Sequence, residues 1–503
     1  MNKNPIENIL IGGTGSGHIG INPRFANRHG LIAGATGTGK TVTLQGLAEG
    51  FSAIGVPVFM ADVKGDLSGI SQPGTPHPKI DERVKYIGIN DFELRGSPVT
   101  YWDVFGKLGT PVRATVADMG PQLLSRLLDL NETQESVLTL VFEYADKEGL
   151  LLLDLKDLRT SLEHISEIGK ELGVGYQVSK ASVNAILRRL LMLEREGGDV
   201  FFGEPSLQLS DFIAHDKNGC GVINVLAAQS LIMTPRVYTT FLLWLISELF
   251  ENLPEVGDPE KPVLVFFFDE AHLLFSNTSK VLLEKIEQVV RLIRSKGVGL
   301  YFVTQSPADL PDTVLGQLGN RIQHGLRAYT PKDQKAVRVA AQTFRPNPKL
   351  NTEQVISELG VGEALVSVLA DKGVPTPVER VLIRPPYSRM GPVNEEERQH
   401  LITTSYLHKR YAETYDPHSA HEELLARASA AIQAQTARHD SSLEHAATTG
   451  HKPDSPSGKA ARPASRNNRQ TLGETFAKSI ARSIGSTLGR RLLRGILGSI
   501  MKK

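Results

Sequence analysis

The sequence predicts an α/β fold with a mostly parallel, doubly wound sheet. Two observations support this prediction. Short apolar runs of strand length alternate along the chain with longer segments whose apolar residues recur at helical spacing. Alternation of strand and helix is typical of sheets whose strands run parallel and whose helices cover both faces. The expected strands are residues 31–33, 56–61, 222–226, 263–268 and 300–304, and the expected helices are residues 41–55, 235–251 and 279–296.

Some segments depart from this alternation. Glycine crowds residues 12–17, which predicts a turn or hairpin, and two alternating runs flank residues 371–373, which predicts another hairpin. Glycine and proline thin out between residues 111 and 205, where helical spacing dominates. The predicted organisation is a short N-terminal β segment (1–30), the first part of the core (31–110), a helical insertion (111–205), the second part of the core (206–386), a helical extension (387–438), a disordered linker (439–470) and a basic amphipathic helix (471–503).

The composition is that of a globular protein with a real core. Hydrophobic residues make up 40% of the 503 residues and the net charge is +1, so we expect any nucleic-acid surface to be local. One cysteine, Cys220, excludes a disulfide framework and a thiolate metal cluster. The N-terminus lacks the pattern of a secretory signal, and the most apolar helical run, 237–250, is shorter than the ~20 residues that span a bilayer. We therefore expect a cytoplasmic protein.

A phosphate-binding loop follows the first expected core strand. Its glycines allow backbone N–H groups to close around phosphate oxygens, and the helix that follows adds the positive end of its dipole. Lys40 is placed to reach the β- and γ-phosphates, and the Thr41 hydroxyl to bind Mg²⁺. The pattern predicts ATP and Mg²⁺ as ligands. The binding residues are Gly34, Ala35, Thr36, Gly37, Thr38, Gly39, Lys40 and Thr41.

Two adjacent carboxylates end the apolar run 263–268. We expect Asp269 to help hold Mg²⁺ and Glu270 to polarise the attacking water, which makes the protein an ATP hydrolase. Taken alone, the pair could equally be a solvated turn or a helix N-cap. Gln305 ends the next apolar strand, where it could sense the γ-phosphate or make a simple turn contact.

Arginine is the residue that ring-shaped ATPases use to neutralise charge in a neighbouring site. Of Arg291, Arg294, Arg321 and Arg327, the best placed are Arg294, which precedes the strand ending at Gln305, and Arg321, which follows it. Each of them taken singly is also compatible with a surface helix or a strand end.

The C-terminal tail combines apolar and basic residues at helical spacing. Such a helix can lie on an anionic membrane, contact nucleic acid or bind a partner protein, and the pattern leaves these alternatives open. The apolar positions are Phe476, Ile480, Ile484, Leu488, Leu492, Ile496 and Ile500, and the basic ones are Lys478, Arg482, Arg490, Arg491, Arg494, Lys502 and Lys503.

The motifs at residues 33–41, 62–67, 267–274 and 294–305 together resemble those of the HerA-like bacterial P-loop ATPases in the HerA/FtsK group. The resemblance covers about residues 6–385. It implies a RecA-like P-loop fold of the type with an additional strand and a catalytic glutamate. It also implies ATP-driven helicase or translocase action on double-stranded DNA by a homo-oligomeric, hexameric ring.

The rival interpretation is an ATPase of the secretion type that moves or remodels protein at the inner membrane, with residues 471–503 as its membrane or protein contact. Stimulation of ATP hydrolysis by DNA would favour the first interpretation, and stimulation by anionic vesicles the second. A nucleotide switch without turnover is a third interpretation, and Glu270 argues against it.

Overall fold

The computed structural model describes residues 7–15, 17–169, 178–275 and 280–448. The chain divides into two compact units, which we describe separately. The first unit comprises Met1–Ala114, Glu196–Phe201 and Pro205–Thr414, and the second comprises Thr115–Arg195, Phe202–Glu204 and Tyr415–Lys503, in each case as far as the structure describes them. Among the described residues, no helix is both long enough and apolar enough to cross a membrane.

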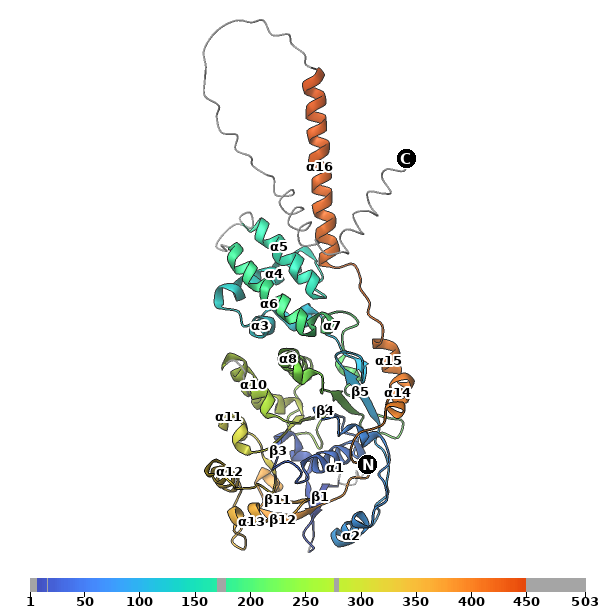
Figure 1. Ribbon diagram of the computed structural model, residues 1–503, viewed down its shortest axis with the longest axis vertical. Helices are drawn as coiled ribbons and strands as arrows, with labels where there is room; N and C mark the ends of the chain where they lie inside the picture. The colour runs from blue at the N-terminus through green and yellow to red at the C-terminus, as the bar shows by residue number, and fades with distance from the viewer. Residues whose placement is uncertain (1–6, 16, 170–177, 276–279, 449–503) are drawn as a thin grey trace. The chain divides into compact units, whose positions relative to one another are not determined.

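The described part of the first unit is built on one 12-stranded sheet (Figure 1). The strands between β10 and β6 pair in parallel, while β11, β12, β1 and β2 continue the sheet in antiparallel pairs. The mostly parallel α/β prediction is confirmed. In sheet order the strands are β2 (His18–Ile21), β1 (Ile9–Gly13), β12 (Glu379–Ile383), β11 (Glu363–Ser367), β10 (Asn320–His324), β3 (Gly30–Ala33), β9 (Val298–Thr304), β8 (Leu264–Phe268), β4 (Val58–Asp62), β7 (Ile223–Ala227), β5 (Val99–Asp103) and β6 (Thr110–Pro111).

All the expected strands are present, and both expected hairpins are too, as β1–β2 and β11–β12. The sequence did not predict β5, β6 or β10. Strand β10 reads Asn-Arg-Ile-Gln-His, which lacks the apolar run typical of a buried parallel strand.

Helices cover both faces of this sheet. On β8, Phe267 packs against Phe51 of α1 with ring centroids 6.2 Å apart, while Phe268 points to the opposite face, beside Leu242 of α8 and Val289 of α10. This alternation follows from the two-residue period of a strand. The helices of the first unit are α1 (Lys40–Ala53), α2 (Pro78–Ile87), α7 (Asp199–Phe201), α8 (Pro235–Asn252), α9 (His272–Phe275), α10 (Lys280–Leu292), α11 (Asp312–Leu315), α12 (Pro331–Gln342), α13 (Thr352–Glu358), α14 (Glu395–Thr404) and α15 (Tyr406–Tyr411).

The second unit is helical where it is described. Its helices are α3 (Val116–Leu127), α4 (Glu132–Glu148), α5 (Leu155–Ile168), α6 (Lys180–Leu193) and α16 (Ala420–Thr448). The expected helical extension is split, because α14 and α15 belong to the first unit and α16 to the second. Helix α16 also continues to Thr448, into the segment expected to be a linker. The basic amphipathic helix predicted for residues 471–503 lies outside the described residues.

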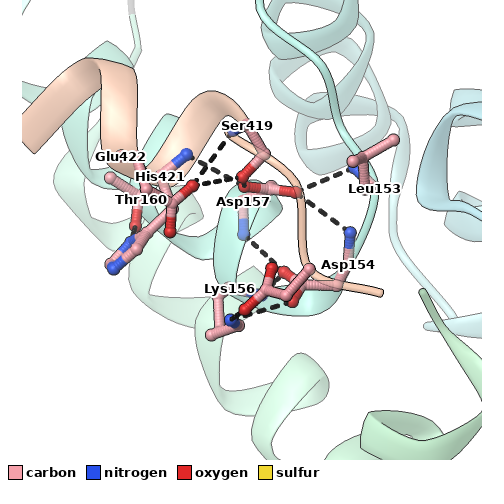
Figure 2. Close-up of polar contacts among 9 residues, drawn as sticks. Leu153, Asp154, Lys156, Asp157, Thr160, Ser419, His421 and Glu422 are labelled. Carbon is pink, nitrogen blue, oxygen red and sulfur yellow. Dashed lines mark hydrogen bonds and ion pairs between the residues drawn. The ribbon is translucent and has the colours of Figure 1, made fainter. Parts of the chain in front are cut away.

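A buried carboxylate joins α5 to the start of α16 (Figure 2). Asp157 is only 1% exposed. One of its oxygens accepts hydrogen bonds from the backbone N–H groups of Leu153 and Asp154, at 2.8 and 3.1 Å. The other accepts from the Ser419 hydroxyl at 2.6 Å and from the His421 N–H at 2.9 Å. Asp157 therefore fixes the N-terminus of α16 within the second unit.

Candidate functional site

The phosphate-binding loop connects β3 to α1 at the carboxyl end of β3. Gly34 and Gly39 have φ angles of 153° and 115°, which side-chain-bearing residues rarely adopt. A Cβ on Gly34 would lie 2.5 Å from the Cβ of His324. The backbone N–H groups of Gly34 and Ala35 donate to carbonyl oxygens at the ends of β9 and β10, at 3.2 and 2.9 Å. The loop is thus held by the two strands that flank β3.

Lys40 begins α1, and its ammonium folds over the loop. Its Nζ donates to the carbonyl oxygens of Gly34 and Ala35 at 2.7 and 3.0 Å. Burial lowers the pKa of Lys40, the nearby Lys64 ammonium lowers it further, and Glu270 and Asp269 act in the opposite direction. A phosphate at this loop would offer the ammonium stronger acceptors than the two carbonyls.

His324, at the end of β10, packs against Gly34 of the loop and binds Thr43 in the first turn of α1. Its Nδ1 lies 3.0 Å from the carbonyl oxygen of Glu363, and its Nε2 lies 2.9 Å from the Thr43 hydroxyl. Since a carbonyl can only accept, Nδ1 carries the proton and Nε2 accepts from Thr43. Burial, followed by the Lys40 ammonium, lowers the pKa of His324 to about 4, so the ring is neutral near pH 7. No sequence motif pointed to this residue.

The acidic pair lies at the carboxyl end of β8. Strand β9 lies between β3 and β8 in the sheet, which is the additional-strand arrangement. Asp269 and Glu270 are both 7% exposed. Burial raises the pKa of Asp269 to about 6, with Lys64 lowering it and Glu270 raising it. Glu270 has a φ of 47°, a left-handed conformation that is uncommon away from glycine and is frequent at functional sites.

Glu270 has a cationic partner, Lys64 of the motif 62–67, and this pairing was not predicted from the sequence. The Nζ of Lys64 lies 2.5 Å from Glu270 Oε1, and the His272 ring lies 3.3 Å from Oε2. Within the described chain, Oε2 is buried without a hydrogen-bond partner. Lys64 follows β4, the strand next to β8 in the sheet.

The loop after β4 adds two more carboxylates to this edge. Asp62 accepts from the N–H groups of Gly65 and Leu67 at 2.7 and 3.3 Å, which fixes the turn. Burial, followed by the charge of Asp66, raises the pKa of Asp62 to about 7. Asp66 accepts a hydrogen bond from the Thr41 hydroxyl at 3.4 Å.

The charges at this edge suit a divalent cation. Among the described residues, the Asp66 Oδ1 and Glu270 Oε2 atoms are buried without a hydrogen-bond partner. In the part of the chain that the structure describes, no group of three or more acidic, histidine or cysteine side chains is arranged to hold a metal ion by itself. Mg²⁺ is commonly bound by one or two protein groups together with substrate phosphates, which fits this arrangement. The charged groups at this edge are the carboxylates Asp62, Asp66, Asp269 and Glu270 and the ammonium groups of Lys40 and Lys64.

The remaining predicted residues are distributed along β9 and β10. Gln305 is exposed at the end of β9, directly after the residue whose carbonyl binds the loop. Arg294 lies before the opposite end of β9, where its half-exposed guanidinium contacts Asp258 at 3.1 Å. Arg321 lies near the start of β10 and donates to three backbone carbonyls, those of Leu318, Leu315 and Thr343. Neither arginine lies at the edge of the sheet that carries the phosphate-binding loop.

The chain matches one protein family and is similar to several known proteins. The family described as "Helicase HerA-like C-terminal" matches residues 7–503. The chain is 24% identical to the DNA double-strand break repair helicase HerA of Sulfolobus acidocaldarius over 71% of this chain and 65% of that protein. It is 25% identical to the protein of the same name from Sulfurisphaera tokodaii, with the same two coverages. The chain thus spans slightly less than two thirds of these relatives.

Among solved structures, VirB4 of Thermoanaerobacter pseudethanolicus is similar at 16% identity and a TM-score of 0.47, covering 76% of this chain and 98% of that one. The match of the family to nearly the whole chain agrees with the loop, the additional strand and the acidic pair described above. The chain belongs to the helicase HerA-like C-terminal family.

Proposed function

We propose that this protein is an ATP-hydrolysing motor that translocates along double-stranded DNA. The observation that carries the proposal is the position of Glu270, which lies at the same sheet edge as the phosphate-binding loop and is separated from β3 by one strand, β9. The relatives named as DNA double-strand break repair helicases support DNA as the substrate.

Each residue has a definite task in this proposal. The loop N–H groups and Lys40 bind the phosphates, and Glu270 takes the proton of the attacking water. Gln305, at the end of β9, orients that water or contacts the γ-phosphate. Thr41 and Asp269 hold Mg²⁺, which when bound neutralises charge on the phosphate oxygens.

We further propose that the motor is a homo-oligomeric ring, which we expect to be hexameric and cytoplasmic, and that Arg294 completes the site of a neighbouring subunit. The guanidinium of Arg294 is half-exposed, and its contact in the described part of the chain is an ion pair with the half-exposed carboxylate of Asp258. Such pairs contribute little and break readily. Arg321, by contrast, is committed to three carbonyls of its own subunit, so the geometry favours Arg294.

The test is ATP hydrolysis by the full chain with and without double-stranded DNA, over a range of salt concentrations. We expect strong stimulation that falls with salt, because contacts with DNA phosphates release counterions. Glu270→Gln should remove turnover while leaving ATP binding intact. A different result would instead support the membrane-associated protein remodeller. In that case the rate of ATP hydrolysis would not change with DNA, would rise with anionic vesicles, and would lose this rise when residues 471–503 are deleted.

A further inference from the structure

We propose that Lys64 is a positioning residue that responds to the γ-phosphate. Its ammonium binds one of two anions at a time: the carboxylate of Glu270 when no γ-phosphate is present, and the γ-phosphate of ATP when it is. When the γ-phosphate draws Lys64 away, the Glu270 oxygen becomes free to accept a proton from water. This inference rests on the proposed ATP hydrolysis and names the residue that couples nucleotide identity to the catalytic carboxylate.

The contact itself is the first argument. Nζ of Lys64 lies 2.5 Å from Glu270 Oε1, so this oxygen is engaged by an ammonium and is not available to water. The Glu270 side chain is 9% exposed, whereas that of Lys64 is 43% exposed. The carboxylate is therefore the fixed partner and the lysine the one that can move.

The loop after β4 presents Lys64 to the site. Asp62 accepts hydrogen bonds from Gly65 and Leu67, so the backbone on the C-terminal side of Lys64 is held in a fixed turn. Gly65 has a φ of 80°, and a Cβ there would lie 2.2 Å from the Gln229 side chain. A firm backbone with a flexible four-carbon side chain lets the ammonium change partners without movement of the strand.

Lys64 is close to the place where phosphate binds. Its charge is the main electrostatic cause, after burial, that lowers the pKa of Lys40, the lysine of the phosphate-binding loop. Lys64 contacts Glu270 and Lys40 contacts the carbonyls of the loop, so both ammonium groups lie at the sheet edge that carries the loop and the acidic pair. A terminal phosphate carries roughly two negative charges near neutral pH, against one for a carboxylate. The γ-phosphate is thus the stronger competitor for Lys64.

Lys64 also has room to move. With Gly65, Asp66 and Gln229 it lines an open cleft of about 450 Å³. Partial burial acts to lower the pKa of Lys64, but Glu270, Asp269 and Asp66 together raise it, so the side chain stays charged near neutral pH. A charged side chain beside open solvent can leave Glu270 without entering an apolar region.

A zero-length crosslink tests the exchange of partners. A carbodiimide joins an amine to a carboxylate only where the two are in contact, and mass spectrometry of the digested full chain identifies the joined peptides. We expect a Lys64–Glu270 crosslink without nucleotide and with Mg²⁺ and ADP. With Mg²⁺ and an ATP analogue that has an imido group between the β- and γ-phosphates, its yield should fall about tenfold, which corresponds to a shift of about 1.4 kcal/mol in the equilibrium.

The chain supplies a matched control. Lys156 and Asp416 form another lysine–carboxylate pair, 3.0 Å apart and exposed, within the second unit. Its crosslink yield should be the same under all three conditions. Lys64→Arg should abolish the first crosslink and leave the second, which confirms the identity of the peptides.

Two results would overturn the inference. One is a Lys64–Glu270 yield that stays constant when the imido analogue saturates the protein, and the other is a failure of this crosslink to form under any condition. Binding of a fluorescent ATP analogue, with Lys40→Ala as the negative control, is measured on the same samples. Failure of the wild-type chain to bind nucleotide would refute the proposed ATPase itself and is thereby distinguished from failure of the Lys64 exchange.

Discussion

Replacement of His324 by glutamine tests whether the phosphate-binding loop rests on a neutral imidazole. His324 is fully buried between the Thr43 hydroxyl and the Glu363 carbonyl. A glutamine side chain can also donate and accept a hydrogen bond, but it does not titrate. The variant therefore removes the proton equilibrium of this position while keeping polar atoms near both partners.

The expected magnitude follows from the pKa of the ring. Burial lowers the pKa of His324 from 6.5 to about 4 in the folded chain. Between these values the unfolded chain binds the proton and the folded chain does not. The contribution of the neutral His324 ring to the free energy of unfolding is therefore fully present above pH 6.5. It is lost as the pH falls towards 4, which lowers the free energy of unfolding by about 3 kcal/mol in total.

Other groups oppose or add to this trend in the wild type. The pKa of His29 is also lowered to about 4, mainly by burial, while burial raises the pKa values of Asp62 and Asp269 to about 7 and about 6. Groups whose carboxylate pKa is raised stabilise the fold as the pH falls, whereas the two histidines destabilise it. The two effects on the free energy of unfolding therefore partly cancel in the wild type. The difference between wild type and His324→Gln removes these shared contributions.

Tryptophan fluorescence during urea unfolding is the appropriate assay. The chain has two tryptophans, Trp102 and Trp244, and both are buried in the first unit, so the signal reports that unit alone. The stability advantage of wild type over His324→Gln should shrink by about 3 kcal/mol between pH 7 and pH 4. A constant difference across this range would refute the neutral, buried imidazole. His29→Gln is the matched control, since it should show the same trend in stability without weakening ATP binding.

Three further predictions concern catalysis and the second unit. Glu270→Gln should lower the turnover number by about 10²- to 10⁴-fold while the Kd for ATP, from fluorescent-nucleotide titration, does not weaken; equal loss of binding would contradict a catalytic role. Arg294→Ala should reduce DNA-stimulated turnover by about 10³-fold without lowering the Tm, whereas Arg321→Ala should lower the Tm because three carbonyls lose their donor; the reverse pattern would make Arg321 the arginine that completes the neighbouring site. Asp157→Ala should destabilise the second unit by more than about 3 kcal/mol, because four donors lose their acceptor. Hydrogen exchange at the start of α16 should then accelerate while tryptophan fluorescence stays unchanged, and unaltered exchange there would argue against this anchor.

The sequence predicted the parts of the site that depend on local pattern. Strands β3, β8 and β9 are apolar runs, and the loop and the acidic pair follow them directly, so their common location at one sheet edge could be inferred. The assignment of ATP chemistry to Lys40 and Glu270 needed nothing beyond this pattern. Their catalytic roles remain predictions.

What the sequence could not show depends on contacts between distant residues. Strand β10 is polar in sequence because its side chains have specific partners elsewhere in the fold, so no apolar periodicity marks it. Asn320 donates to the carbonyls of Phe25 and His29, and His324 binds Thr43. Lys64 lies in the motif 62–67 that the sequence did mark, but its contact with Glu270 could not be predicted, because Glu270 follows a strand that is adjacent in the sheet and remote in the chain.

The position of β9 explains why these long-range partners matter for the chemistry. Neighbouring strands are about 4.8 Å apart, so the additional strand places the ends of β3 and β8 roughly 10 Å from each other. A terminal phosphate and a water molecule fit within a separation of this size. The contacts of the Glu270 side chain come from two residues outside the loop. Lys64, which follows β4, binds Oε1, and His272, at the start of α9, lies 3.3 Å from Oε2.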